Sequence, residues 1–260
     1  MPIAKVNGIN ICYKIVGEGD PLVMIMGLGS NQNNWRFQIP SFKKFYRIIT
    51  FDNRGAGNSD KPKGPYSIRQ MADDTIGLMD HLGIMKAHVL GTSLGGMIAQ
   101  EIAINYPERV LKLVLGCTFA CQDEDNGGTP QWDKSMDEFI NNHKIPSVKL
   151  ACNTLLYRIL GLFLLRMLYG SMEDKDRAGF IAQNEASQKH YTKDRLSLII
   201  APTLIIVGTG DKAILPGSSD TMAKLIPNAK IAKIQNGSHL LMIEHRGRFN
   251  KEVLDFLKNG

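Results

Sequence analysis

Ser93 is the residue whose surroundings point most directly to chemistry. It is the centre of a Gly-Thr-Ser-Leu-Gly motif at 91–95, which follows a short apolar run at 87–90 and precedes an amphipathic helical pattern over 94–104. A strand, a Gly-x-Ser-x-Gly turn and a helix form a nucleophile elbow, which exposes the serine oxygen at the positive end of a helix. The motif alone occurs by chance in many chains, but the flanking glycines leave the room that such a strained turn needs. We predict that Ser93 is a catalytic nucleophile.

A serine hydroxyl is a weak nucleophile and needs a base, which we expect to be His239. This histidine follows Asn-Gly-Ser at 236–238, between the last strand pattern and the last helix pattern. It should therefore lie at the carboxyl end of the sheet, as Ser93 does. The other histidines are expected in structural places: a core strand for His88, a helix end for His81, a solvent-facing helix start for His245 and a helix-rich segment for His143 and His190.

Asp211 is the candidate for the acid that orients the imidazole and stabilises its charged form. It follows an apolar run at 203–207 and a glycine turn, so it too should lie at a strand's carboxyl end. One alternative is that Asp211 only caps the following turn. Another is that the acid is Asp123, which lies in a polar loop beyond the apolar run at 111–115.

Acyl transfer also needs two N–H donors for the developing oxyanion. We expect the backbone amides of Leu94, directly after the nucleophile, and of Leu28, in the Met-Gly-Leu-Gly stretch at 26–29. Glycines beside Leu28 would let this loop approach a substrate. A Gly-x-Gly after a strand can also indicate dinucleotide binding, but the third glycine is missing and the polar run at 30–34 does not fit that site.

The order of patterns along the chain predicts an α/β fold with a mostly parallel, eight-stranded sheet and helices on both faces. Asn7-Gly8 predicts a tight hairpin turn between the first two strands. The expected strands are 4–6, 11–15, 22–26, 47–51, 87–90, 111–115, 203–207 and 231–234, and the expected helices include 68–82, 94–104 and 244–257. The core would comprise 1–120 and 197–260.

The stretch 121–196 does not continue the alternation of strand and helix patterns. We interpret it as a helical lid inserted into the core. Its run at 155–168 is the most apolar in the chain, but Arg158 and Arg166 divide it too closely for a membrane span of about 20 uncharged residues. We expect an apolar lid helix over an apolar pocket; a contact with a membrane surface or a homodimer face are the alternatives. The expected pocket residues are Gly27, Trp35, Phe119, Leu160, Phe163 and Leu240.

Composition narrows the classes of function. The chain has 260 residues, 43% of them hydrophobic, and a formal charge of +6 without a Lys/Arg block, which argues against nucleic acid as a partner. Cys12, Cys117, Cys121 and Cys152 match no zinc or redox spacing, so we expect buried free thiols in a reducing compartment. With no signal-like segment at the first residues, we expect a cytoplasmic protein. The sequence implies no metal and no cofactor.

Together these motifs resemble the α/β-hydrolase superfamily over essentially the whole chain. The resemblance rests on Asp-x-Arg-Gly-x-Gly-x-Ser at 52–59, Gly-x-Ser-x-Gly-Gly-Met at 91–97, the terminal Gly-Ser-His and the order Ser93, Asp211, His239. Within this superfamily, the sequence most resembles enzymes of the 3-oxoadipate enol-lactone hydrolase type and carboxyl methyl esterases. The resemblance implies that Arg54 ties its loop down. Many relatives have His-Gly where this chain has Met26-Gly27, and a serine nucleophile argues against the dehalogenases and epoxide hydrolases.

The expected activity is hydrolysis of small esters or lactones with apolar or aromatic acyl groups, through an acyl-enzyme. Acyl transfer, perhydrolysis and hydrolysis of a carbon–carbon bond would use the same three side chains. A ligand receptor on a hydrolase scaffold is the alternative from a different class, and fold alone does not decide between them.

Overall fold

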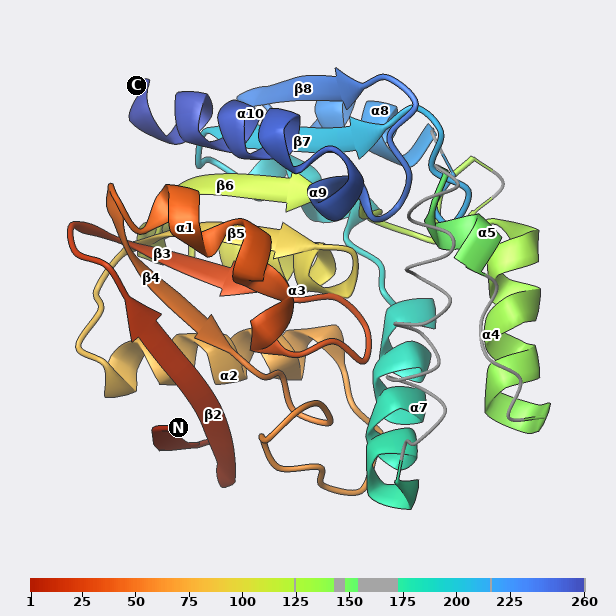
Figure 1. The fold of residues 1–260 in the computed structure, drawn as a ribbon, viewed down its shortest axis with the longest axis horizontal. Coiled ribbons are helices and arrows are strands. Elements are labelled where there is room, and N and C mark those ends of the chain that lie inside the picture. Colours follow the sequence, from red (N-terminus) through yellow and green to blue (C-terminus); the bar gives the residue numbers. More distant parts are fainter. Residues whose placement is uncertain (124, 143–147, 154–172, 216, 260) are drawn as a thin grey trace.

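The structure is a computed structural model, which describes the chain except for residues 124, 143–147, 154–172, 216 and 260. One sheet carries all eight strands in the order β1-β2-β4-β3-β5-β6-β7-β8, and its six strands from β3 to β8 run parallel, as predicted (Figure 1). The strands are β1 (Ile3–Val6), β2 (Ile9–Val16), β3 (Asp20–Ile25), β4 (Tyr46–Phe51), β5 (Ala87–Thr92), β6 (Val110–Gly116), β7 (Thr203–Gly208) and β8 (Ala229–Ile234).

The predicted tight hairpin joins β1 to β2. Val6 pairs with Ile9, and Asn7 and Gly8 both have positive φ angles, 48° and 80°. Two consecutive positive φ angles are typical of a type I′ turn, which the Asn-Gly pair favours.

Helices cover both faces of the sheet, also as predicted. The α-helices are α1 (Ile39–Phe42), α2 (Ile68–His81), α3 (Leu94–Asn105), α4 (Pro130–Asn142), α5 (Val148–Ala151), α7 (Asp174–Gln188), α8 (Gly217–Leu225), α9 (Leu241–Glu244) and α10 (Arg246–Lys258). The described part of the chain also contains the short 3-10 helices η1 (Gln32–Phe37), η2 (Pro107–Arg109) and η3 (Lys193–Leu198).

One predicted helix is divided in the structure. The pattern over 244–257 was expected to form a single closing helix, but His245 leaves the helical torsions (φ −115°, ψ 36°) and separates α9 from α10. By contrast α2 begins as expected, where the Ser67 hydroxyl accepts the Gln70 N–H at 3.1 Å and caps the first turn.

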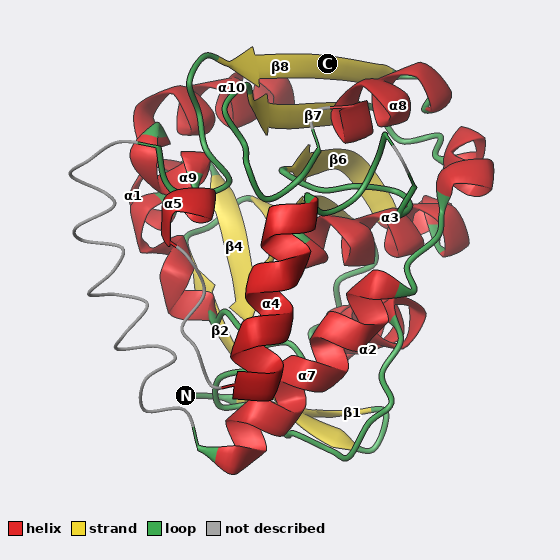
Figure 2. Cartoon of the chain, turned by 90° about the vertical axis from the view of Figure 1, so that its right-hand side faces the viewer, coloured by secondary structure: helices red, strands yellow, loops and turns green. Residues whose placement is uncertain are grey.

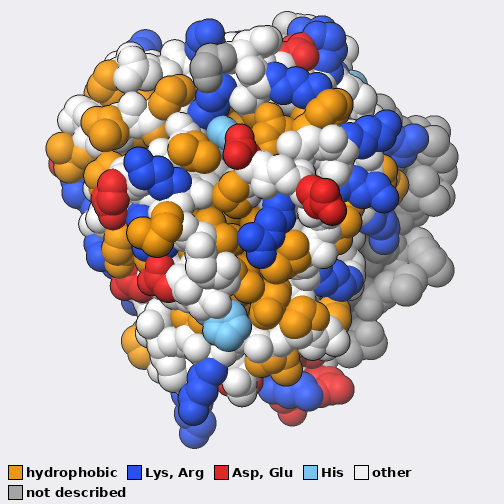
Figure 3. Space-filling view, turned by 90° about the vertical axis from the view of Figure 1, so that its left-hand side faces the viewer, with side chains coloured by type: hydrophobic (Ala, Val, Ile, Leu, Met, Phe, Trp, Pro, Cys, Tyr) orange, Lys and Arg blue, Asp and Glu red, His pale blue; other side chains and the backbone are white. Residues whose placement is uncertain are grey.

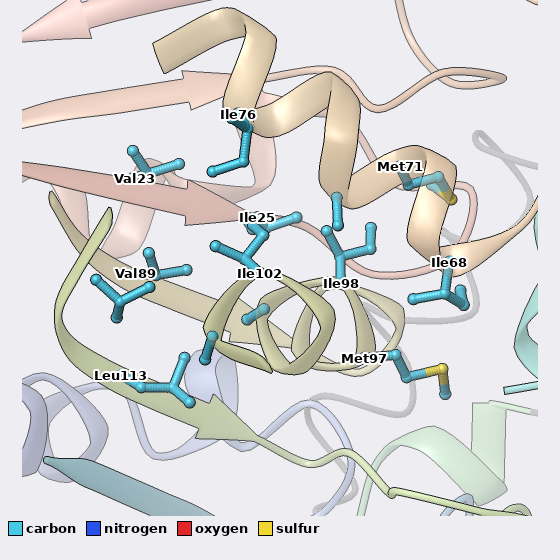
Figure 4. Close-up of a cluster of buried hydrophobic side chains, with 14 of the residues drawn as sticks. Val23, Ile25, Ile68, Met71, Ile76, Val89, Met97, Ile98, Ile102 and Leu113 are labelled. Atoms are coloured by element: carbon cyan, nitrogen blue, oxygen red, sulfur yellow. The ribbon is translucent and has the colours of Figure 1, made fainter. Parts of the chain in front are cut away.

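Alternate residues of the central strands feed two cores on opposite faces of the sheet. Val23 and Ile25 of β3 join the core under α2 and α3, where Figure 4 shows Ile98 and Ile102 of α3 beside them. Leu22 and Met24 point to the other face and pack with side chains of α1 and α10. Each fully buried aliphatic side chain of this kind contributes roughly 1.5–3 kcal/mol to folding. The rigid strands therefore hold the loops at their ends in fixed positions.

The described helices of the 121–196 segment lie across the carboxyl end of the sheet, between β6 and β7 in the chain. Figures 1 and 2 show α4 and α7 on this side, in front of the ends of the strands. Figure 3 shows the opposite end, where Lys and Arg side chains are spread among apolar and uncharged ones. In the ranges that the structure describes, no helix is long and apolar enough to cross a membrane.

Candidate active site

Ser93 lies at the sharp turn between β5 and α3. Its backbone has φ 55° and ψ −123°, a conformation that non-glycine residues rarely adopt. A Cβ at position 91 would clash with the backbone of Gly95, and a Cβ at position 95 would clash with the Ile25 carbonyl. Glycine is therefore required on both sides of the serine because the backbone of the turn packs against itself and against β3.

The structure brings the three candidate residues together in one hydrogen-bonded series. His239 Nε2 lies 3.1 Å from Ser93 Oγ, and His239 Nδ1 lies 3.0 Å from Asp211 Oδ2. The other Asp211 oxygen accepts the N–H groups of Ala213 at 2.8 Å and Ile214 at 3.1 Å. Asp211 thus caps its own turn, as one alternative stated, and contacts the imidazole as well.

The second candidate acid lies elsewhere. Asp123 accepts a hydrogen bond from Lys193 Nζ at 2.8 Å and contacts Cys121 Sγ at 3.2 Å. The hydrogen bonds from Lys193, Asn126 and Cys121 lower the pKa of Asp123 below its usual range. Its carboxylate is therefore occupied in a surface cluster rather than beside an imidazole.

The two expected oxyanion donors are not paired with any described residue. Among the described residues, neither the Leu28 nor the Leu94 backbone N–H has a hydrogen-bond acceptor. Leu28 lies in the loop after β3, and Leu94 begins α3. A Cβ at Gly27 would lie 3.1 Å from Ser93 Cβ, so the glycine lets this loop pass directly over the nucleophile.

Gln183 of α7 holds this loop in place, and no sequence motif had indicated this residue. Its Oε1 accepts the Gly29 N–H at 2.9 Å, and its Nε2 donates to the Arg54 carbonyl at 2.6 Å. The side chain is completely buried. Arg54 in turn forms a buried ion pair with Asp74, Nη2 to Oδ1 at 2.7 Å, which matches the structural part that the resemblance implied for it.

A cavity of about 140 Å³ opens beside Ser93 and His239, and most of its wall is apolar. Two regions build it: loops at the strand ends and helices of the 121–196 segment. From the segment come Trp132, Met136 and Phe180, none of which the sequence singled out. The Trp132 ring lies with its centroid 5.8 Å from that of His239.

The expected pocket residues have different outcomes. Gly27 and Leu240 line the main cavity, and Phe119 lines a smaller one on another side of Ser93. The prediction that Trp35 lines the pocket was wrong. This residue is fully buried in the core beneath α1 and α10 and lines neither cavity. The register of η1 turns its indole toward the sheet, which the sequence could not indicate. Leu160 and Phe163 lie outside the described residues.

Two other histidines bear on the expectations. His88 is buried, as expected, and burial lowers its pKa. Its polar atoms were expected to be satisfied, but Nδ1 has no hydrogen-bond partner among the described residues. His245 was expected to face solvent, but it is only partly exposed, and its buried Nε2 has no hydrogen-bond partner among the described residues. The reason is the break between α9 and α10, which places this residue at a bend instead of on an outer helix face.

All four cysteines are buried, as expected, and Cys12, Cys117 and Cys121 are free thiols. Cys117 follows β6 in a left-handed conformation (φ 45°) and lines the main cavity. Burial and the nearby Asp211 charge raise its pKa well above the ordinary value, so the group is a thiol and not a thiolate.

Comparison with known proteins gives one family and several chemistries. A family model described as alpha/beta hydrolase fold matches residues 20–246. The chain is similar to the enol-lactonase from Burkholderia xenovorans LB400, with a TM-score of 0.87 and 30% identity over 99% of this chain and 100% of that one.

Two further relatives carry different names. A meta-cleavage product hydrolase from Pseudomonas fluorescens IP01 has a TM-score of 0.82 and 29% identity, over 99% of this chain and 97% of that one. A proline iminopeptidase from Pestalotiopsis fici is 29% identical, over 98% of each chain. The shared feature of these names is a hydrolytic enzyme, while the bond that is cleaved differs.

Proposed function

We propose that this chain, which belongs to the alpha/beta hydrolase fold family, cleaves carboxylic esters or lactones through an acyl-enzyme on Ser93. The hydrogen-bonded series from Ser93 through His239 to Asp211 carries the proposal. A serine, an imidazole and a carboxylate in this order are the groups that nucleophilic acyl transfer requires.

In the first step, His239 Nε2 takes the proton from Ser93 Oγ as this oxygen attacks the substrate carbonyl carbon. The imidazolium then gives that proton to the leaving alkoxide, which in a lactone stays attached to the acyl group. In the second step, His239 takes a proton from water, and the resulting hydroxide attacks the acyl-enzyme. The bond between the acyl carbon and Ser93 Oγ then breaks, the acid is released, and His239 Nε2 returns the proton to Ser93 Oγ. Asp211 holds Nδ1 protonated, so that Nε2 is the nitrogen that accepts.

The backbone N–H groups of Leu28 and Leu94 would bind the oxyanion of each tetrahedral intermediate. Their lack of acceptors among the described residues supports this role, because donors already paired would have to break a bond first. Each such donor contributes on the order of 10²-fold to 10³-fold in kcat in other acyl-transfer enzymes.

The cavity supports apolar or aromatic acyl groups as the substrate class. Its walls near Ser93 are formed by side chains such as Leu28, Trp132 and Phe180, and none of its described lining residues is acidic. The enol-lactonase relative supports lactones as one form of substrate.

A panel of p-nitrophenyl esters of increasing acyl length, with a parallel set of lactones, tests the proposal. We expect hydrolysis with release of the free acid, labelling of Ser93 by a fluorophosphonate, and loss of both in Ser93→Ala. Turnover of p-nitrophenyl esters that is unchanged in Ser93→Ala would refute the proposal. Product analysis in the presence of alcohol or peroxide would separate hydrolysis from acyl transfer and perhydrolysis.

A further inference from the structure

Cys117 places a sulfur atom beside the pair formed by Asp211 and His239. The Cys117 Sγ, an Asp211 carboxylate oxygen and a ring nitrogen of His239 all lie within 4.8 Å of one another. Three loops from different strand ends bring these atoms together, after β6, after β7 and after β8. The proposed hydrolytic chemistry uses the last two of these residues and has no task for the first.

We propose that Cys117, Asp211 and His239 form an inhibitory binding site for a zinc ion. Zinc prefers a tetrahedral set of thiolate, imidazole and carboxylate ligands, with metal–ligand distances of about 2.0–2.3 Å. Such a set separates nitrogen from oxygen by about 3.3 Å and either from sulfur by about 3.6 Å. The observed Nδ1–Oδ2 distance is 3.0 Å, so an ion would replace the hydrogen-bonded proton, and the imidazole or the carboxylate would have to turn so that the two atoms move apart and out of line.

The surroundings of the three groups favour this ion over harder cations. A thiolate and an imidazole select zinc over magnesium or calcium, which prefer oxygen ligands. Cys117 and His239 both line the main cavity, which gives an ion a path to the site and leaves the fourth position open for water. The second Asp211 oxygen remains fixed by the N–H groups of Ala213 and Ile214, so the carboxylate is already oriented.

Binding would switch off the base by changing its tautomer. Coordination by Nδ1 requires that this nitrogen lose its proton, and a neutral imidazole then carries its proton on Nε2. The Cys117 thiol proton passes to solvent, so one proton is released for each ion bound. A protonated Nε2 cannot accept the proton of Ser93. The inhibition rests on the proposed function of His239, whereas the binding does not.

Cobalt binding to the Ser93→Ala protein tests the site without any need for activity. We expect one equivalent of Co²⁺ to give a thiolate-to-cobalt charge-transfer absorption, which added zinc removes. Cys117→Ser and Cys117→Gly should lack this absorption; the glycine suits the left-handed backbone and provides a second variant if serine impairs folding. Cys121→Ser is the matched control, because Cys121 is also a buried cysteine beside an aspartate, 3.2 Å from Asp123, and should keep the absorption.

Inhibition is measured next, on the protein with Ser93 intact. We expect zinc to inhibit ester hydrolysis reversibly, with EDTA restoring the rate, and Cys117→Ser to need at least about tenfold more zinc relative to its own zinc-free rate. No cobalt absorption, or an absorption that persists in both Cys117 variants, would overturn the site. Binding without inhibition would overturn its inhibitory role. If the wild-type chain hydrolyses no ester, the proposed function fails while the cobalt titration still decides the site.

Discussion

The loops at the strand ends and the helices of the 121–196 segment meet at one cavity, but they contribute different things. The loops provide Ser93, Asp211 and His239, whose hydrogen bonds carry the proposed reaction. The helices provide Trp132 and Phe180, which define a shape. A change in the loops should therefore affect every substrate, whereas a change in the helices should affect substrates according to their size.

The substitution Asp211→Asn should cause the largest loss of activity. It tests the expectation that a change in the loops affects every substrate. The asparagine can still cap Ala213 and Ile214, but its amide would donate to His239 Nδ1 and hold the proton on the wrong nitrogen. We expect kcat to fall by about 10⁴-fold for short and long esters alike, with KM little changed.

Asp123→Asn is the matched control, because Asp123 was the other candidate acid in the sequence and pairs with Lys193 instead. Its kcat should stay near that of the wild type. Thermal unfolding followed by circular dichroism checks that both variants remain folded. A loss of kcat in Asp123→Asn comparable to that in Asp211→Asn would contradict the assignment.

Gln183 connects the two regions, and its replacement tests how far they are independent. Gln183→Met preserves the volume but leaves the Gly29 N–H and the Arg54 carbonyl without their partner. The loop that carries the Leu28 amide would then shift, and we expect kcat to fall on the order of 10-fold to 100-fold while KM changes less. Two unpaired buried groups should also reduce stability by about 1–3 kcal/mol each.

The same substitution at an exposed glutamine of α4, Gln131→Met, serves as the control and should leave kcat unchanged. Gln183→Glu separates the two hydrogen bonds, because its carboxylate can accept from the Gly29 N–H but cannot donate to the Arg54 carbonyl. If Gln183→Met loses only stability and keeps the wild-type kcat, Gln183 does not position the oxyanion loop.

Sequence patterns predicted the positions of residues in the strand-end loops far better than the contacts made by the helices of the 121–196 segment. Apolar strand patterns that end near a glycine place the following residues at the carboxyl edge of the sheet. This reasoning predicted that Ser93 and His239 lie close together, and they are 3.1 Å apart in the structure. No comparable sequence pattern indicates the contacts that the 121–196 segment makes with the loops. Gln183 reaches Gly29 across 154 residues, and only the folded chain brings them together. Nothing in the sequence distinguishes Trp132, which lies against His239, from Trp35, which lies in the core.

Trp132→Ala should change which esters are preferred rather than the chemistry. The indole forms part of the wall beside His239, and its removal enlarges the space for the acyl group. We expect kcat/KM to fall about tenfold for aromatic and long acyl esters and to change little for acetate, because only a large acyl group loses contact area. Trp35→Phe is the contrasting variant: it should lower the melting temperature without altering the order of preference. An equal loss for all acyl lengths in Trp132→Ala would mean that the helices also govern the reaction itself.

We expect His190 to make the attachment of the helical segment sensitive to acid, and this should be the smallest of the expected effects. The residue is buried at the end of α7, where its Nε2 lies 3.3 Å from the hydroxyl of Thr192, and burial lowers its pKa from 6.5 to about 4. The unfolded chain therefore binds a proton between these two values while the folded chain does not. Stability is fully present above pH 6.5 and falls as the pH decreases toward 4, by about 1 kcal/mol between pH 6.5 and 5.5.

The variant His190→Gln should lack the loss of folding stability that protonation of His190 causes at low pH. His81→Gln, at an exposed helix end, should retain it. Urea unfolding of each variant at pH 7.5 and pH 5.5 gives the difference directly. Hydrogen exchange at the lower pH should show α7 losing protection before the central strands, because the strands are held by the cores on both faces of the sheet and not by this histidine. Loss of protection in β5 and α7 at the same pH would mean that the two regions unfold as one unit, and the contrast between them would then be one of chemistry alone.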